Sequence, residues 1–155
     1  MPELPEVETV KNFLDIHLLN KKIKFAKILN KKLRYEIPSK ISKIIVGCRI
    51  TKIIRRGKYL IFLLNNNYAT LIHLGMTGCF RVSSDKLQRK HDHFAVTLEN
   101  NRIIFNDVRK FGFIKLYKTD EIYNCSHLKN IGPEPLSEDF TFQSFIEKKK
   151  KKNLN

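Results

Sequence analysis

The chain has 155 residues, 42% of them hydrophobic, which suits one domain with a core of ordinary size. Thirty lysines and arginines stand against 15 acidic residues, and the formal net charge of +15 indicates a polyanionic partner, with nucleic acid as the first candidate. The sequence has neither an apolar run of membrane-spanning length nor a basic-then-apolar leader, so we expect an intracellular protein outside the membrane.

The first predicted element is an amphipathic helix over residues 5–19. Its apolar residues Val7, Val10, Leu14 and Leu18 recur at helical spacing, and Pro5 suits a first helical turn. Strand-like segments rich in Ile, Val, Phe, Tyr and Thr follow at 23–29, 44–55, 59–64, 68–74, 78–83, 93–98, 102–107 and 113–117. This pattern predicts a mainly β fold with flanking helices, a two-layer β-sandwich of about eight strands with an N-terminal helix.

After residue 118 the pattern changes to a short helix around 120–129, a turn at 132–136 and a last helix from about 141. We expect residues 1–140 to form the domain and residues 141–155 to begin a further helix. Lys148–Lys152 form a run of five like charges, which repel one another on a helix. A frayed basic tail and a premature end of the coding sequence both explain this run.

The three cysteines, Cys48, Cys79 and Cys125, lie far apart and form no C-x-x-C pair. Their odd number and spacing predict neither a disulfide framework nor a zinc site. We expect buried, reduced thiols.

Six short motifs occur in order along the chain: PELPEVET at 2–9, RRGKYL at 55–60, HLGMTG at 73–78, KHDHF at 90–94, DVRKFG at 107–112 and GPEPL at 132–136. Together they closely resemble the formamidopyrimidine-DNA glycosylases of the Fpg/Nei family. The resemblance covers the chain to about Lys152 and implies that family's N-terminal catalytic domain. It also implies that the helix-two-turn-helix element, the base-covering loop and the zinc finger are absent, so we expect no cofactor or metal in this chain.

The resemblance assigns Pro2 as the nucleophile, exposed once Met1 is removed. An α-amino group has a pKa of about 7.7–8.0, so part of it is unprotonated at neutral pH. As a secondary amine, proline condenses to an iminium that is cationic without an extra proton. On its own, Pro2 is also explained as a helix-start proline.

Three charged residues complete the implied catalytic group. Glu3 is the implied proton donor, Glu6 the residue that orients groups in the pocket, and Lys58 the ammonium that holds a phosphate or donates a proton during β-elimination. The alternatives are complementation of the helix dipole for both glutamates and a solvated charge after a turn for Lys58.

The resemblance also implies DNA-contacting residues, namely His73, His91, Arg109 and, within the lysine run, Lys152. Met76, Arg109 and Phe111 match residues that fill the space left by an extruded nucleotide. The alternative for His73 is a strand histidine with a satisfied ring, and in isolation residues such as Met76 and Phe111 more often belong to the core.

DVRKFG departs from the family pattern at two positions, since Val108 and Lys110 replace a common proline and arginine. The charge is kept, and we expect the loop to work.

The implied function is a DNA glycosylase with lyase activity at abasic sites, acting as a monomer on oxidised purines in damaged double-stranded DNA. Two alternatives remain open from the sequence. One is a DNA-binding remnant without catalytic activity. The other is half of a split enzyme whose C-terminal half is a separate chain.

Overall fold

The computed structural model describes residues 4–131; residues 1–3 and 132–155 lie outside the described part, and with them the predicted turn at 132–136, the predicted last helix and Lys152. The described residues form two four-stranded antiparallel sheets and an N-terminal helix, which confirms the predicted mainly β sandwich. The helical elements are α1 (Leu4–His17), α2 (Ile41–Ile45) and the single 3₁₀ turn η1 (Ile122–Asn124). The strands are β1 (Phe25–Ile28), β2 (Ile50–Arg56), β3 (Tyr59–Leu64), β4 (Tyr68–His73), β5 (Gly78–Ser83), β6 (Asp92–Thr97), β7 (Arg102–Asp107) and β8 (Phe113–Lys118).

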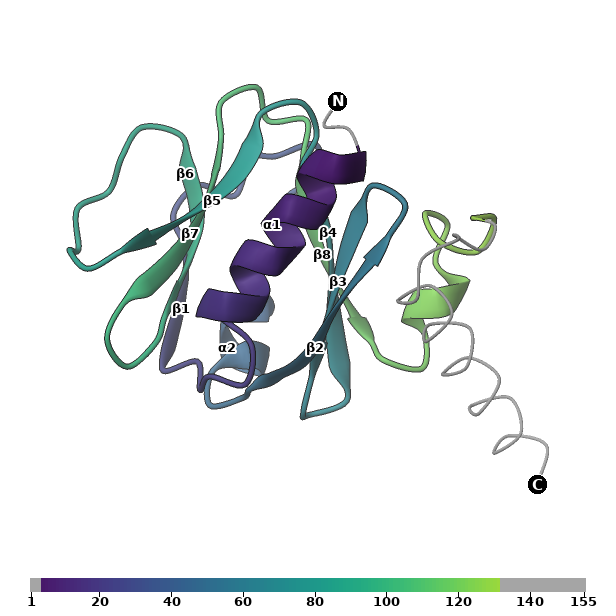
Figure 1. Cartoon of the computed structure of the whole chain (residues 1–155), viewed down its shortest axis with the longest axis horizontal. Helices are drawn as coiled ribbons and strands as arrows, with labels where there is room; N and C mark the ends of the chain where they lie inside the picture. The colour runs from purple at the N-terminus through teal and green to yellow at the C-terminus, as the bar shows by residue number, and fades with distance from the viewer. Residues whose placement is uncertain (1–3, 132–155) are drawn as a thin grey trace.

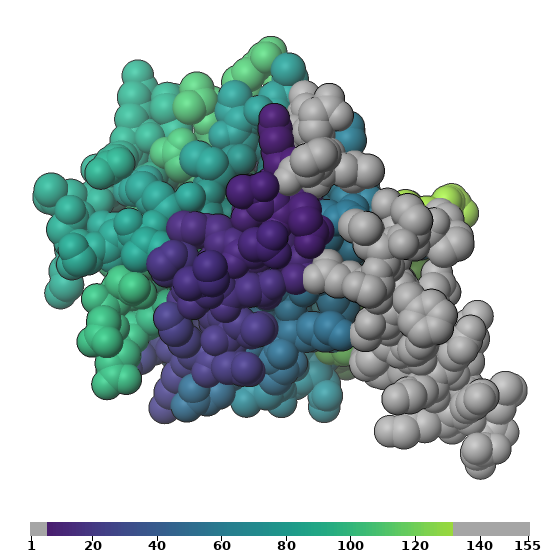
Figure 2. Space-filling view, in the orientation of Figure 1, coloured from purple at the N-terminus to yellow at the C-terminus, as the bar shows by residue number. Residues whose placement is uncertain are grey.

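The strand order is β1-β6-β7-β5 in one sheet and β2-β3-β4-β8 in the other. Figure 1 shows the two sheets side by side with α1 lying across the space between them. Helix α1 contacts β2 and β3 of one sheet and β5 of the other. In Figure 2 the helix is visible on this face of the molecule, flanked by residues of both sheets. Helix α1 is therefore in contact with both sheets of the sandwich.

The apolar face of α1 explains why this segment is helical and where it packs. Val7, Leu14 and Leu18, spaced seven and four residues apart, are at most 2% exposed and belong to the main core. Lys11 is also buried, between Val7 and Leu14 on the same face, and its ammonium forms an i,i+4 ion pair with Asp15 at 2.7 Å. The helix ends at His17, close to the predicted boundary.

The β2-β3-β4-β8 sheet is covered on both faces. One face lines the main core between the sheets, and the other packs against Ile122, Cys125 and Leu128. Strands β3 and β4 are therefore almost continuously buried, which explains their unbroken apolar runs in place of alternation. The predicted helix at 120–129 is wrong in form, because only the turn η1 is helical there and the rest is a covering loop.

The predicted strand at 44–55 is wrong at its start. Residues 41–45 form the short helix α2, and β2 begins only at Ile50. Ile41 and Ile45 are both buried and lie about 6 Å apart along the axis of α2, so both side chains reach the same part of the core. In a strand the same two residues would lie about 13 Å apart. Gly47, at φ +85°, then redirects the chain into β2.

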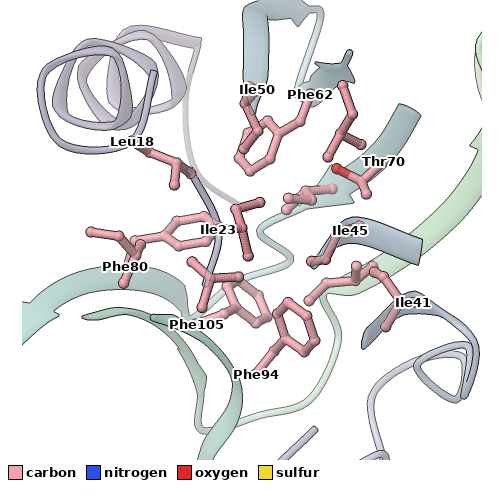
Figure 3. Close-up of a pocket in the computed structure, with 15 residues that line it drawn as sticks. Leu18, Ile23, Ile41, Ile45, Ile50, Phe62, Thr70, Phe80, Phe94 and Phe105 are labelled. Atoms are coloured by element: carbon pink, nitrogen blue, oxygen red, sulfur yellow. The ribbon is translucent and has the colours of Figure 1, made fainter. Parts of the chain in front are cut away.

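A small cavity of about 40 Å³ lies between the sheets. Figure 3 shows its lining as aliphatic and aromatic side chains from both sheets, α2 and the end of α1, with the Thr70 hydroxyl as the polar exception. No titratable side chain lines it. This space belongs to the hydrophobic core and offers no acid, base or nucleophile.

The cysteine prediction holds only in part. Cys48, Cys79 and Cys125 are free thiols, but only Cys125 is buried and Cys79 is exposed. Cys79 stays exposed because it points away from the core on β5, an edge strand of its sheet.

Candidate active site and nucleic-acid interface

The predicted nucleophile and proton donor, Pro2 and Glu3, lie outside the described residues, which begin at Leu4 in α1. Glu6, the predicted pocket residue, is exposed in the first turn of α1. A carboxylate there also complements the positive end of the helix dipole, so its placement fits both a pocket role and a dipole role.

Arg55 connects the first part of α1 to the turn that carries Lys58. Its Nε donates a hydrogen bond to Glu8 Oε2 at 2.7 Å, and its Nη1 donates to the Gly57 carbonyl oxygen at 3.0 Å. The Arg55 side chain is 1% exposed. Lys58 follows Gly57 and is half-buried. The first part of α1 and the β2–β3 turn are therefore fixed relative to each other by a partly buried ion pair.

Sequence reasoning missed this Arg55–Glu8 pair. The available signal was a charged residue at the end of the apolar strand β2, where a buried arginine needs an acidic partner. Its partner lies 47 residues away in the sequence, so no local pattern identifies it.

His73 lies at the end of β4, beside the start of β3. It pairs with Tyr59, the residue after Lys58, in the β3–β4 register, and its ring stacks on Phe113 with centroids 5.5 Å apart. Nδ1 accepts a hydrogen bond from the Gly75 N–H at 3.0 Å. In the neutral ring the proton is therefore on Nε2, which is left as a donor. Nδ1 is therefore satisfied within the fold, as the strand-histidine explanation expects. The predicted phosphate contact would use the other nitrogen, Nε2.

Burial, together with the nearby charges of Arg34, His127 and Lys58, lowers the pKa of His73 to about 4. The imidazole is therefore neutral at physiological pH. Such a ring offers a hydrogen bond to an anion without adding a positive charge.

We expect the His73 ring to titrate near pH 4 in the folded chain. The unfolded chain takes up this proton near pH 6.5, so the stabilising effect of the neutral ring is complete above that pH and declines as the pH falls towards 4. Between pH 7 and pH 5 the loss amounts to about 2 kcal/mol. Urea denaturation of the parent and a His73→Gln variant at both pH values measures it, and equal losses in the two proteins would contradict the assignment.

The predicted void-filling residues come from two neighbouring loops. Met76 lies between β4 and β5 and is 47% exposed; Phe111 lies between β7 and β8 and is 46% exposed. The guanidinium carbon of Arg109 lies 5.2 Å from the centroid of the Phe111 ring. Both apolar side chains are thus surface residues, and the explanation that they form part of the core does not apply.

The two loops are in direct backbone contact. A Cβ placed on Gly75 would lie 2.5 Å from the Gly112 nitrogen and 2.7 Å from the Phe111 carbonyl carbon. Only glycine fits at such an approach. We refer to residues 74–78 and 108–112 together as the paired loops.

His91 lies at the same end of the sandwich as the paired loops. Its backbone is in the left-handed region at φ 69°, and its carbonyl oxygen accepts a hydrogen bond from the Asp107 N–H at 3.0 Å. The structure therefore places His91 beside the strand end that leads to Arg109. The fourth predicted DNA contact, Lys152, lies outside the described residues.

The loop that carries His91 is fixed by the buried carboxylate of Asp92. That carboxylate accepts hydrogen bonds from both terminal nitrogens of Arg81, from the Asn106 amide and from the Arg89 N–H. Burial disfavours the charged form, but these hydrogen bonds outweigh it and lower the pKa of Asp92 to about 2. Asp92 stays ionised at neutral pH and holds the start of β6 in place.

Within residues 4–131, no group of three or more His, Cys, Asp or Glu side chains is arranged to hold a metal ion. Over the same residues, the structure contains no helix with both the length and the apolar character needed to span a membrane.

Comparison with curated proteins gives formamidopyrimidine-DNA glycosylases among the similar relatives. The formamidopyrimidine-DNA glycosylase of Rickettsia bellii is 41% identical over 145 residues, covering 92% of this chain and 53% of that protein. The glycosylase of the same name from Bartonella quintana is 39% identical over 167 residues, covering 96% of this chain and 57% of that protein. The chain therefore spans about half the length of the curated relatives it matches.

Solved structures agree with the sequence comparison. The chain is similar to the Lactococcus lactis Fpg in complex with DNA containing an abasic site, with a TM-score of 0.79 and 37% identity over 95% of this chain and 55% of that one. A complex of the same protein with DNA containing N7-benzyl-Fapy-dG gives the same TM-score at 38% identity.

The sequence profile of the formamidopyrimidine-DNA glycosylase N-terminal domain matches residues 1–114, which is most of the chain. With the paired loops, the Lys58 turn and His73 arranged as described, the profile and the relatives agree on one conclusion. The chain belongs to the formamidopyrimidine-DNA glycosylase family.

Proposed function

We propose that this chain carries the catalytic half of a DNA glycosylase that excises oxidised purines, such as 8-oxoguanine and formamidopyrimidines, and then cleaves the strand at the abasic site. The observation that carries the proposal is the exposed group of Met76, Arg109 and Phe111 on two loops in contact, on a strongly basic protein. An enzyme that acts on C1′ must extrude the nucleotide, and apolar side chains with an arginine fill the space it leaves.

The similar solved structures support DNA as the partner, because they hold DNA with an abasic site and DNA with a Fapy-type lesion. Double-stranded DNA that contains a damaged base is therefore the proposed substrate.

In the proposed chemistry the Pro2 nitrogen donates its lone pair to C1′ of the damaged nucleotide. The N–C1′ bond forms as the glycosidic bond breaks, and the departing base takes that electron pair together with a proton, which Glu3 supplies. The proton on the attached nitrogen passes to O4′ as the C1′–O4′ bond breaks, and the nitrogen lone pair forms the C1′ iminium. Removal of a C2′ proton converts the iminium to an enamine. The enamine electrons then form the C2′=C3′ bond and restore the iminium as the 3′ phosphate leaves with the C3′–O electron pair, which cleaves the strand. The nitrogen acts as both nucleophile and electron sink, so these steps need no added cofactor.

Lys58 and His73 are proposed to act on the phosphates around the reacting sugar. They lie at the same end of the central strands β3 and β4, because Tyr59, which follows Lys58, pairs with His73. An ammonium supplies charge and a neutral imidazole supplies a directed N–H donor, so the two contacts differ in their dependence on salt. Glu6 is proposed to orient groups in the pocket from the first turn of α1.

Borohydride trapping on a duplex with one abasic site tests the proposal. We expect a covalent adduct between the chain and the DNA, because reduction of the iminium makes the N–C1′ bond permanent. DNA binding without an adduct would favour the DNA-binding remnant, and an adduct that needs a separately expressed C-terminal half of a relative would favour the split enzyme. Failure to bind or trap in the presence of that half would overturn the proposed function.

A further inference from the structure

The paired loops meet at one buried carboxylate to which the proposed chemistry gives no role. Asp107 lies at the end of β7 and is 0% exposed. Its Oδ1 accepts hydrogen bonds from Thr77 Oγ1 at 2.6 Å and from the Lys110 N–H at 3.1 Å, and its Oδ2 accepts one from the Gly112 N–H at 2.9 Å. One side chain therefore holds both loops.

Thr77 extends this link from the first loop to the second. Its hydroxyl donates to Asp107 Oδ1 and also accepts a hydrogen bond from the Arg109 N–H at 2.9 Å. The loop that carries Met76 is thus hydrogen-bonded, through the Thr77 hydroxyl, to the backbone of Arg109. A valine in its place would keep the shape and lose both bonds.

The surroundings leave this arrangement little freedom. A Cβ on Gly112 would lie 2.8 Å from Asp107 Oδ2, and the Lys110 backbone is in the left-handed region at φ 64°. The fully buried His93 places its Nε2 2.9 Å from the Asp107 carbonyl oxygen, which fixes the backbone of Asp107 as well. Hydrogen bonds to a buried carboxylate, such as those that the Asp107 side chain accepts, are stronger than hydrogen bonds between neutral groups.

We propose that Asp107 and Thr77 form a clamp that sets the separation of Met76 from Arg109 and Phe111, and that both act as positioning residues for void filling. This inference rests on the proposed function, since only a protein that extrudes a nucleotide needs the wedge and the arginine held ready at the same time. Without the clamp, each loop would become ordered only when it binds DNA. The conformational entropy lost in that ordering would make extrusion of the nucleotide less favourable.

The test compares Thr77→Val with the conservative Thr77→Ser, which keeps the hydroxyl. Thr77 is only half-buried, so both variants are expected to fold. The first readout is amide hydrogen exchange in the free chain. We expect the Arg109 and Lys110 amides to exchange at least about tenfold faster in Thr77→Val, and at the parent rate in Thr77→Ser.

The second readout is the rate of borohydride-trapped adduct on two DNAs. One is a duplex with an intact oxidised purine, which must be extruded, and the other is a single-stranded oligonucleotide with an abasic site, which leaves no hole to fill. We expect Thr77→Val to lose about tenfold or more on the duplex and to match the parent on the single strand. A merely structural role would lower both rates together.

Each other outcome overturns a defined part of the inference. Unchanged amide exchange in Thr77→Val overturns the clamp, and faster exchange with an unchanged duplex-to-single-strand ratio overturns its positioning role. Equal impairment of Thr77→Ser would show that the hydroxyl is not the cause. If the parent forms no adduct on either DNA even with a separately expressed C-terminal half of a relative present, the proposed function fails and the positioning role fails with it, while amide exchange still decides whether the clamp exists.

Discussion

Replacing Pro2 with glycine is expected to lower the rate of adduct formation on abasic DNA by at least about 100-fold, equivalent to roughly 2.7 kcal/mol of activation free energy. A primary amine must keep an extra proton to give a cationic imine, whereas the secondary amine of proline gives a cationic iminium directly. The measurement is the initial rate of borohydride-trapped adduct at saturating DNA. Acetylation of the same nitrogen, which ties up its lone pair in an amide, should remove the adduct completely.

Pro5→Ala is the matched control for this variant. Pro5 lies in the same motif, in the first turn of α1, where alanine also fits a helix. We expect its adduct rate to stay within about twofold of the parent rate, a difference below roughly 0.4 kcal/mol. A Pro2→Gly chain that traps DNA as fast as the parent would contradict the assignment of the nucleophile.

Replacing Gly75 with alanine is expected to lower the free energy of unfolding by about 3 kcal/mol or more. Its backbone at φ +59° costs an L-residue about 1–2 kcal/mol, and a new Cβ only 2.5 Å from the Gly112 nitrogen adds an overpacking cost of about 1–3 kcal/mol. The neighbour is backbone, which cannot rotate away as a side chain can. Chemical denaturation with the slope held common to all variants measures the loss.

Two further glycines separate the causes of this loss. Gly47 has φ +85° and nothing within 4 Å of the place that a Cβ would take, so Gly47→Ala should show the backbone cost alone. Gly112 has no positive φ but would place Cβ 2.6 Å from the His73 carbonyl oxygen, so Gly112→Ala should show the steric cost alone. A Gly75→Ala variant no less stable than Gly47→Ala would contradict the close packing of the paired loops.

Most strands could be predicted from the sequence because their apolar residues are bounded by turn-forming glycines and asparagines. Asn67, for example, adopts φ 66° in the β3–β4 turn, as its residue type favours. Helix α2 could not be separated from β2, because the isoleucines between 41 and 54 satisfy a helical and an extended pattern equally well. Only the packing of Ile41 and Ile45 into the core decides between them.

The loop at 119–131 shows a second limit. Its apolar residues Ile122, Cys125 and Leu128 recur every three residues, which favours a helix, yet only 122–124 are helical. The outer face of the β2-β3-β4-β8 sheet supplies the apolar surface that these side chains need, so burial is achieved without a regular helix.

The residues of the candidate site also fall into those that the sequence identifies and those that it does not. The residues expected to touch DNA, including Met76, Arg109 and Phe111, stand in short motifs and could be named from the sequence. The residues that hold them could not. Asp107 bonds to Thr77 across 30 positions and Arg55 bonds to Glu8 across 47, so each becomes visible as a partner only when the sheets bring the segments together.

The central claim is that the amino-terminal nitrogen makes the bond to deoxyribose, and mass spectrometry of the borohydride-trapped complex tests it most directly. After protease and nuclease digestion, we predict that the mass of the reduced sugar remnant lies on the peptide that begins at Pro2, with Met1 removed, and that fragmentation places it on the first residue. A remnant on Lys58 or on any other side chain, or an adduct on a chain that still carries Met1, would contradict the account.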